Sequence, residues 1–96
     1  MTRRMLRHRI HVTGKPQVRN IHSDPLHVAA ERLGVGEDAP HVVDFWAEGT
    51  IEDAGTDRTF LVVGTGQPIP DGARWWGTTA RTADGLVWHL YELPQD

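Results

Sequence analysis

His22, Ser23 and Asp24 carry the three side-chain types of a hydrolytic triad, and they are the most obvious candidates for chemistry in this chain. Consecutive residues cannot aim at one another in that way, because a triad is assembled in space from separate segments. Ser23, the chain's one serine, is better interpreted as a helix cap or as part of an Asx turn. No pair of carboxylates has a spacing recognisable for hydrolysis, so we expect no catalytic residue.

The six histidines do not have the spacing of metal ligands. No two of them stand four residues apart, as on one face of a helix, or two apart, as on one face of a strand. The chain also has no cysteine, and so it has neither a thiolate ligand nor a disulfide. We therefore expect no metal or other cofactor, and a reducing, cytoplasmic setting fits best.

The stretch Gly64, Thr65, Gly66 and Gln67 is a candidate phosphate-binding loop. A phosphate cradle needs its glycines to open a helix whose N-terminal amides face the anion. Two prolines within the next three residues prevent a helix from starting promptly, and no lysine follows. We interpret the loop as a rigid turn, with nucleotide binding as the alternative.

His89 and the pair Trp75 and Trp76 are candidate binding side chains in the second half of the chain. His89 interrupts an otherwise apolar strand between Trp88 and Leu90. It is either a partly buried histidine satisfied by a backbone carbonyl, or a polar group at the floor of a small pocket beside a tryptophan. Neighbouring strand residues point to opposite faces, so one indole of the tryptophan pair should reach a surface or an interface.

Charge is distributed unevenly along the chain. Lys and Arg number 10 against 13 Asp and Glu, for a net charge of −3, yet residues 1–20 hold six of the ten basic residues and no acid. The arginines of this stripe are Arg3, Arg4, Arg7, Arg9 and Arg19. The stripe is either a strand charged to deter edge pairing or a contact face for nucleic acid or an acidic protein. The acidic total argues against nucleic acid.

The elements that hold these residues are predicted to be strands. Leu6, His8, Ile10 and Val12 alternate with polar residues, which is the period of a strand with one buried face. After a turn over 13–16, we expect residues 18–21 to return as the second strand of a hairpin. This hairpin would carry the arginine stripe.

Residues 25–33 allow two interpretations. A cap at Ser23-Asp24, a proline in the first turn, helical spacing of apolar residues and a following glycine predict a short helix. A helix of this length is marginal unless packing supports it, and Leu26-His27-Val28 fits a strand equally well. A loop follows over 34–40 on either interpretation.

Further strands are predicted over 41–48, 60–63, 74–81 and 86–93, with an acidic loop over 48–57 and a glycine- and proline-rich loop over 64–72. Asp84-Gly85 between the last two strands indicates a tight hairpin turn. The expected fold is therefore mostly β: a small single domain over residues 1–96, built as an antiparallel sheet, sandwich or barrel. It should have six or seven strands and at most one short helix.

Three of these strands are apolar on both faces, so a second face needs cover. The residues expected to point away from the core are Val42, Trp46, Leu61, Val63, Val87 and Tyr91. A chain this short has little material left to cover them. A closed barrel or a cap formed by residues 25–40 is one solution; a twofold interface, which we favour, predicts a homodimer.

Five motifs follow one another in order: DPLHV at 24–28, FWA at 45–47, GTGQPIP at 64–70, WGT at 76–78 and GLVWHL at 85–90. Together they resemble a group of small proteins of unassigned function found in phages and in actinobacterial genomes that carry prophages. Relatives usually have a much shorter, hairpin-like stretch between the first two motifs. The resemblance implies a strand at 26–30 and a phage or prophage origin, and it supplies no catalytic residue.

The function we expect is that of an interaction module that binds a host or phage protein. The resemblance, the missing catalytic constellation and the surplus of aromatic surface favour it. One alternative is a small-ligand or nucleotide-binding protein with its site between the 64–70 loop and His89. Another is a nucleic-acid binder that uses the arginine stripe, with Trp75 or Trp76 stacked on a base. No apolar run is long enough for a signal peptide or membrane span.

Overall fold

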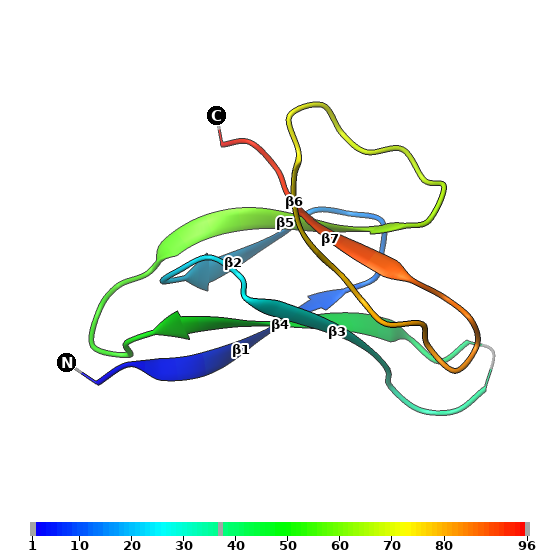
Figure 1. The fold of residues 1–96 in the computed structure, drawn as a ribbon, viewed down its shortest axis with the longest axis horizontal. Helices are drawn as coiled ribbons and strands as arrows, with labels where there is room; N and C mark the ends of the chain where they lie inside the picture. The colour runs from blue at the N-terminus through cyan, green and yellow to red at the C-terminus, as the bar shows by residue number, and fades with distance from the viewer. Residues whose placement is uncertain (1, 37, 96) are drawn as a thin grey trace.

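The computed structural model describes residues 2–36 and 38–95, which form seven strands in two antiparallel sheets (Figure 1). Sheet A has the strand order β1-β4-β3, and sheet B has the order β2-β5-β7-β6. The strands are β1 Arg4–His11, β2 Gln17–Ile21, β3 His27–Arg32, β4 His41–Gly49, β5 Thr56–Gly64, β6 Arg74–Thr78 and β7 Trp88–Glu92. The expected mostly β fold is confirmed, and it takes the form of a sandwich.

Three residues lie outside this description. Met1 and Asp96 are the ends of the domain predicted over 1–96, and Glu37 belongs to the loop predicted over 34–40. Within the described ranges, no helix is long and apolar enough to cross a membrane.

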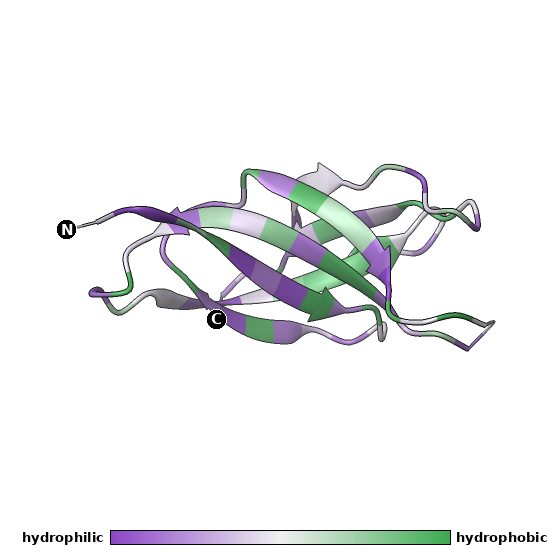
Figure 2. Cartoon of the chain, turned by 90° about the horizontal axis from the view of Figure 1, so that it is seen from below, coloured by the Kyte–Doolittle hydropathy of each residue, from purple (hydrophilic) through white to green (hydrophobic). Residues whose placement is uncertain are grey.

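The core lies between the two sheets. Alternation along β1 and β4 turns Ile10, Val43 and Phe45 inward from sheet A, where Phe60 and Leu90 of sheet B meet them. The rings of Phe45 and Phe60 are 4.9 Å apart across the sheets in a tilted arrangement, which aromatic pairs favour. Figure 2 shows the alternation as hydrophilic and hydrophobic bands along the strands. The period-two pattern of the sequence therefore identified the buried faces correctly.

The predicted hairpin of residues 6–21 is wrong in one respect, because its two strands lie in different sheets. β1 pairs with β4, and β2 pairs with β5. Ile10 and Ile21 face the same core from opposite layers, so the turn over 13–16 crosses from one sheet to the other. The arginine stripe is split as a result, with Arg7 and Arg9 in sheet A and Arg19 in sheet B.

Residues 27–32 form a strand, so the helical interpretation of 25–33 is wrong. β3 pairs with β4 in continuous register, from His27 opposite Trp46 to Arg32 opposite His41. Ser23 caps no helix here; its hydroxyl donates to the carbonyl of Glu48. The long-range ladder with β4 therefore outweighs the local helical pattern, as expected for a short helix with little intrinsic stability.

The outward-facing apolar residues are largely covered within one chain. Val42, Leu61 and Val63 are all buried. Gln67 and Pro68, from the loop between β5 and β6, lie beside Leu61 and Val63. The reason given for a dimer, an uncovered second apolar face, does not hold for these three residues. Association of two copies stays a prediction.

The strands of the β6–β7 hairpin are shorter than predicted. The turn between them lies where the sequence predicts it. The N–H of Thr82 donates to the carbonyl of Leu86 at 2.8 Å, and Gly85 has a φ of +84°. That left-handed backbone favours glycine. The strands end at Thr78 and begin again at Trp88 because the chain between them follows this turn.

Candidate functional site

A groove of about 450 Å³ opens between β3 and β6, each the last strand of its sheet. One wall is formed by residues 26–30, and the other by residues 75–78 and 80–82. The groove brings Trp75 and Trp76, both predicted binding residues, to a segment nearly fifty positions earlier in the sequence.

Both walls of the groove are strand edges. In the described structure β3 is paired only with β4, and β6 only with β7. The N–H of Leu33 donates to the carbonyl of Pro40 at 2.8 Å. The N–H of Leu33 therefore points toward the β4 side. Amide groups alternate in direction along a strand, so the N–H of Ala30, three residues earlier, points away from β4. An edge of this kind is a template for pairing with a further strand.

The opposite edge of sheet A, formed by β1, is blocked by side chains over its C-terminal part. The side-chain amide of Gln17 accepts from the N–H of His11 at 3.0 Å and donates to the carbonyl of His11 at 2.6 Å. Arg19 Nε donates to the carbonyl of Arg9 at 2.8 Å. These bonds occupy backbone groups that a further strand would need. In the described part of the chain, no side chain makes a corresponding bond to residues 28–31.

The two tryptophans lie at a β-bulge in β6. Trp75 is paired with Tyr91 and Gly77 with Leu90, so Trp76 is the extra residue of the bulge. Trp76 packs against the core, whereas Trp75 is 56% exposed at the groove. The expectation that one indole of the pair reaches a surface is confirmed.

Trp76 is held by a carboxylate and by two arginines. Its Nε1 donates to Glu92 at 2.9 Å, and Arg58 donates twice to the same carboxylate at 2.7 Å. The guanidinium of Arg74 lies 4.3 Å from the Trp76 ring centroid. The hydrogen bonds from Arg58 hold the pKa of Glu92 below its ordinary value. The bulge is therefore fixed from inside, which also fixes the backbone that presents Trp75.

Gly77 allows the two walls to meet. A Cβ on Gly77 would lie 2.7 Å from a methyl carbon of Val28, closer than real side chains approach. The backbone of β6 therefore comes against β3 at a point where only glycine fits without a shift. Both residues of this contact line the groove.

His89 lies under the loop that follows β5 and helps to line a hollow of about 150 Å³ with Ile69 and Tyr91. Both ring nitrogens meet threonine hydroxyls: Nε2 is 3.0 Å from Thr65 Oγ1, and Nδ1 is 2.9 Å from Thr78 Oγ1. The expected backbone carbonyl partner is therefore replaced by two hydroxyls. Since Thr78 Oγ1 also accepts from the Trp75 indole at 3.0 Å, His89 connects the loop to the groove.

The residues Gly64, Thr65, Gly66 and Gln67 form a turn closed by its own hydrogen bonds. The N–H of Gln67 donates to the carbonyl of Gly64 at 3.1 Å, and the side chain of Gln67 accepts from the N–H of Gly64 at 2.7 Å. The predicted turn is confirmed. An anion at this loop would have to compete with Gln67 for the Gly64 amide.

Trp46, Arg7 and Arg9 occupy a different surface, the outer face of sheet A. Arg7 lies opposite Trp46 in the β1–β4 ladder, and the rings of His27 and Trp46 are 5.7 Å apart across β4 and β3. Arg9 is bound by both oxygens of buried Asp44, at 2.8 and 3.1 Å. The predicted site residues thus lie in three places: the groove, the hollow under the 64–67 loop, and the outer face of sheet A. His27 lines the groove and contacts Trp46 on that outer face.

The histidines are dispersed through the molecule. His8 stacks on Phe45 with ring centroids 5.0 Å apart, and burial lowers its pKa. His22 bonds to the carbonyl of Asp53, and His41 packs against Trp88. Over residues 2–36 and 38–95, no three His, Asp or Glu side chains form a group that could hold a metal ion.

Sequence reasoning did not select Leu26, Ala30, Gly77 or Arg81 as site residues. Two of them belong to the segment whose helical and strand patterns were equally good, so nothing local marked it as an edge. Gly77 directly follows the two tryptophans, a position where a glycine in a strand indicates a bulge or a close backbone approach. That signal was present in the sequence.

A family model matches the chain over residues 1–96, under the description Domain of unknown function (DUF7352). The chain belongs to this family. Neither the curated proteins nor the solved structures contain a match. Since the description of DUF7352 assigns no activity, the function of the chain has to be argued from its own groove.

Proposed function

We propose that this chain is a protein-interaction module that binds an extended polypeptide segment by adding it to β3 as a further strand of sheet A. The observation that carries the proposal is the unblocked edge of β3 beside a groove, in a sheet whose other edge is occupied by Gln17 and Arg19. Strand addition draws its affinity from main-chain hydrogen bonds and its specificity from pockets for alternate side chains.

Leu26 and Trp75 supply the apolar surface for such a segment, and we call them the apolar rim. They line the groove and are 63% and 56% exposed. Tryptophan is enriched among the residues that dominate binding energy. Because Thr78 already holds the indole of Trp75, little side-chain freedom is lost when a partner packs against it.

The resemblance to phage and prophage proteins leads us to propose a host or phage protein as the source of the segment, and the cytoplasm as the place of encounter. Two features weigh against the alternatives. Gln67 occupies the Gly64 amide that a nucleotide phosphate would use. Arg9 and Arg19, half of the basic residues considered for nucleic acid in β1 and β2, are already bonded within the chain.

Substitution Ala30→Pro tests strand addition. Proline removes the N–H that points away from β4 and leaves the β3–β4 ladder intact, which is the edge position where strands tolerate proline. Peptides selected on the wild-type chain from a random library, long enough to pair with the six residues of β3, should bind Ala30→Pro at least about tenfold more weakly. The matched control Ala30→Ser keeps the donor and should bind normally.

Thermal unfolding shows whether Ala30→Pro remains folded. If it does and still binds the selected peptides with wild-type affinity, strand addition is wrong. If the proline variant unfolds, Trp75→Ala replaces it, because an exposed indole can be removed with little effect on the core. Unchanged binding to Trp75→Ala would then exclude this groove.

A further inference from the structure

In the part of the chain that the structure describes, the walls of the groove carry an arginine and no acid. Its described lining includes Arg81 and the imidazole of His27 but neither Asp nor Glu, although the whole chain has 13 acidic residues against 10 Lys and Arg. Arg74 adds a second arginine beside it, over the ring of Trp76. The groove is thus a cationic and apolar region of an acidic protein.

Arg81 makes no ion pair with any other residue that the structure describes. By contrast, Arg9, Arg32 and Arg58 each bind a carboxylate. Arg81 is exposed, and it lines both the groove and a neighbouring hollow of about 560 Å³ that includes Trp88. Its guanidinium is therefore accessible to an anionic group that enters the groove.

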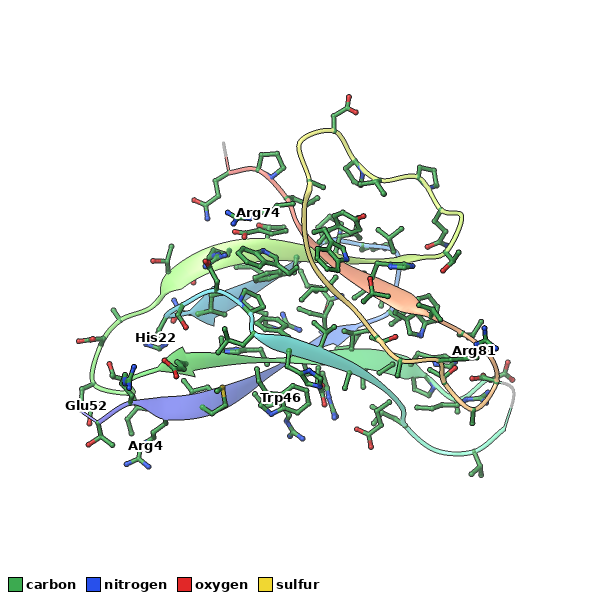
Figure 3. The ribbon with its side chains drawn as sticks, viewed as in Figure 1. Arg4, His22, Trp46, Glu52, Arg74 and Arg81 are labelled. Carbon is green, nitrogen blue, oxygen red and sulfur yellow. The ribbon has the colours of Figure 1, made fainter. Side chains whose placement is uncertain are left out.

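Arg81 lies at one end of the groove and the apolar rim at the other. Val28 lies against Gly77, whereas Arg32, four residues further along β3, pairs with Asp84 at 3.2 Å. The two walls therefore run in the same direction, which puts Arg81 beyond Gly77 on the side of Arg32. Figure 3 shows Arg81 near the turn before β7, well away from Arg74 at the start of β6.

We infer that the segment added to β3 is acidic: one of its carboxylates pairs with Arg81 while an apolar side chain packs on the apolar rim. The inference rests on the proposed function. Four residues of extended chain, such as those from Leu26 to Ala30 along one wall of the groove, span roughly 13 Å. Residues an even number apart share a face of a strand. An apolar and an acidic residue about four positions apart would therefore reach both ends of the groove.

Selection of the same random-peptide library on three chains tests the inference: wild type, Arg81→Gln and Arg7→Gln. Arg7 is the matched control, an exposed arginine on the outer face of sheet A. Peptides from the wild type and from Arg7→Gln should be enriched in Asp and Glu, and those from Arg81→Gln should not. Replacing the acidic residue of a selected peptide by its amide should weaken binding to the wild type about threefold to fivefold, the strength of an exposed ion pair. High salt should reduce this difference.

The outcomes separate the two proposals. If peptides that distinguish wild type from Ala30→Pro show no excess of acidic residues, or keep that excess on Arg81→Gln, the acidic partner is wrong and strand addition stands. If no recovered peptide distinguishes wild type from Ala30→Pro, the proposed function itself is overturned.

Discussion

Glu92 joins three parts of the candidate site through one carboxylate. It accepts from Arg58 of β5 and from Trp76 of the bulge, and it lies in β7 between them. Its side chain and that of Arg58 are only 15% and 16% exposed. Removing one partner of a buried charge pair is costly, because the other charge stays behind unpaired.

Substitution Glu92→Gln should lower the free energy of unfolding by about 2 kcal/mol at neutral pH, the scale of hydrogen bonds to charged groups. The pKa of Glu92 is lowered in the folded chain, chiefly by Arg58, from an ordinary value of 4.5. Its contribution is therefore complete above that value and is lost as the pH falls through the lower folded-state pKa. Urea unfolding of both chains at several pH values measures this, and a difference that does not shrink in acid would contradict it.

His8 should make stability depend on pH in a higher range. Burial, then His22 and Arg19, lower its pKa from 6.5, so below that value the unfolded chain binds more protons than the folded one. The contribution of His8 to the free energy of unfolding is complete above about pH 6.5, and it decreases as the pH falls through the lower folded-state pKa. Thermal unfolding should show that His8→Phe, which keeps a ring against Phe45, loses this part of the pH dependence. An unchanged profile in the variant would exclude His8 as its source.

At the scale of elements, the two edges of sheet A are treated differently. The C-terminal part of β1 is closed by side chains from β2, whereas no described residue bonds to the edge of β3 beside the groove. Natural sheets commonly protect their edges against pairing with other chains. An open edge that coincides with a groove and an exposed tryptophan is therefore the distinctive element of this fold.

Gln17→Ala should open the second edge. Loss of its two bonds to His11 should cost about 1–2 kcal/mol and expose the edge of β1 to pairing between molecules. The matched control is Gln95→Ala, which loses a bond to the carbonyl of Asp57 in sheet B. Light scattering during incubation measures the association; equal scattering from both variants would show that Gln17 does not protect the edge.

Gly77→Ala should separate the walls of the groove. The added Cβ meets Val28, and overpacking of this kind costs about 1–3 kcal/mol. A double variant with Val28→Ala should recover part of the loss, because it removes the methyl carbons that collide. Unfolding free energies of the two single variants and the double variant form a cycle, and strict additivity would show that the contact does not limit the approach of β3 and β6.

At the scale of the whole molecule, self-association as a symmetric dimer stays a prediction. The surface now expected to form the interface differs from the apolar face first considered. Val42, Leu61 and Val63, first considered for the interface, are buried in one chain. The edge of β3 remains open, and two such edges around a twofold axis would join both copies of sheet A.

Sedimentation at tens of micromolar should give a mass near twice the 10.8 kDa of the chain, since the association is bimolecular and favoured by concentration. Ala30→Pro, or an excess of a selected peptide, should return the mass to that of one chain. Trp46→Glu places a charge on the outer face of sheet A instead and should leave the dimer intact. A wild-type mass of one chain under these conditions rules the dimer out.

The sequence was sufficient for properties that depend on neighbouring residues. Period-two alternation located the strands other than β3 and their buried faces, because each of them shows its own pattern of contact with the core. Local backbone geometry also predicts the turn at 84–85 and the opposite directions of the Trp75 and Trp76 side chains. The mostly β, antiparallel character of the fold, with six or seven strands, was predictable on these grounds.

Pairing between distant segments required the tertiary structure. β3 is a strand because β4 offers it a continuous ladder, and no feature within 25–33 reports that partner. β1 and β2 lie in different sheets because β1 pairs with β4 and β2 pairs with β5, instead of β1 pairing with β2. The groove also depends on tertiary structure, because its two walls meet only when the two sheets stack. Hydrogen bonding and burial between remote residues are properties of the assembled layers, and neither segment shows them in its own sequence.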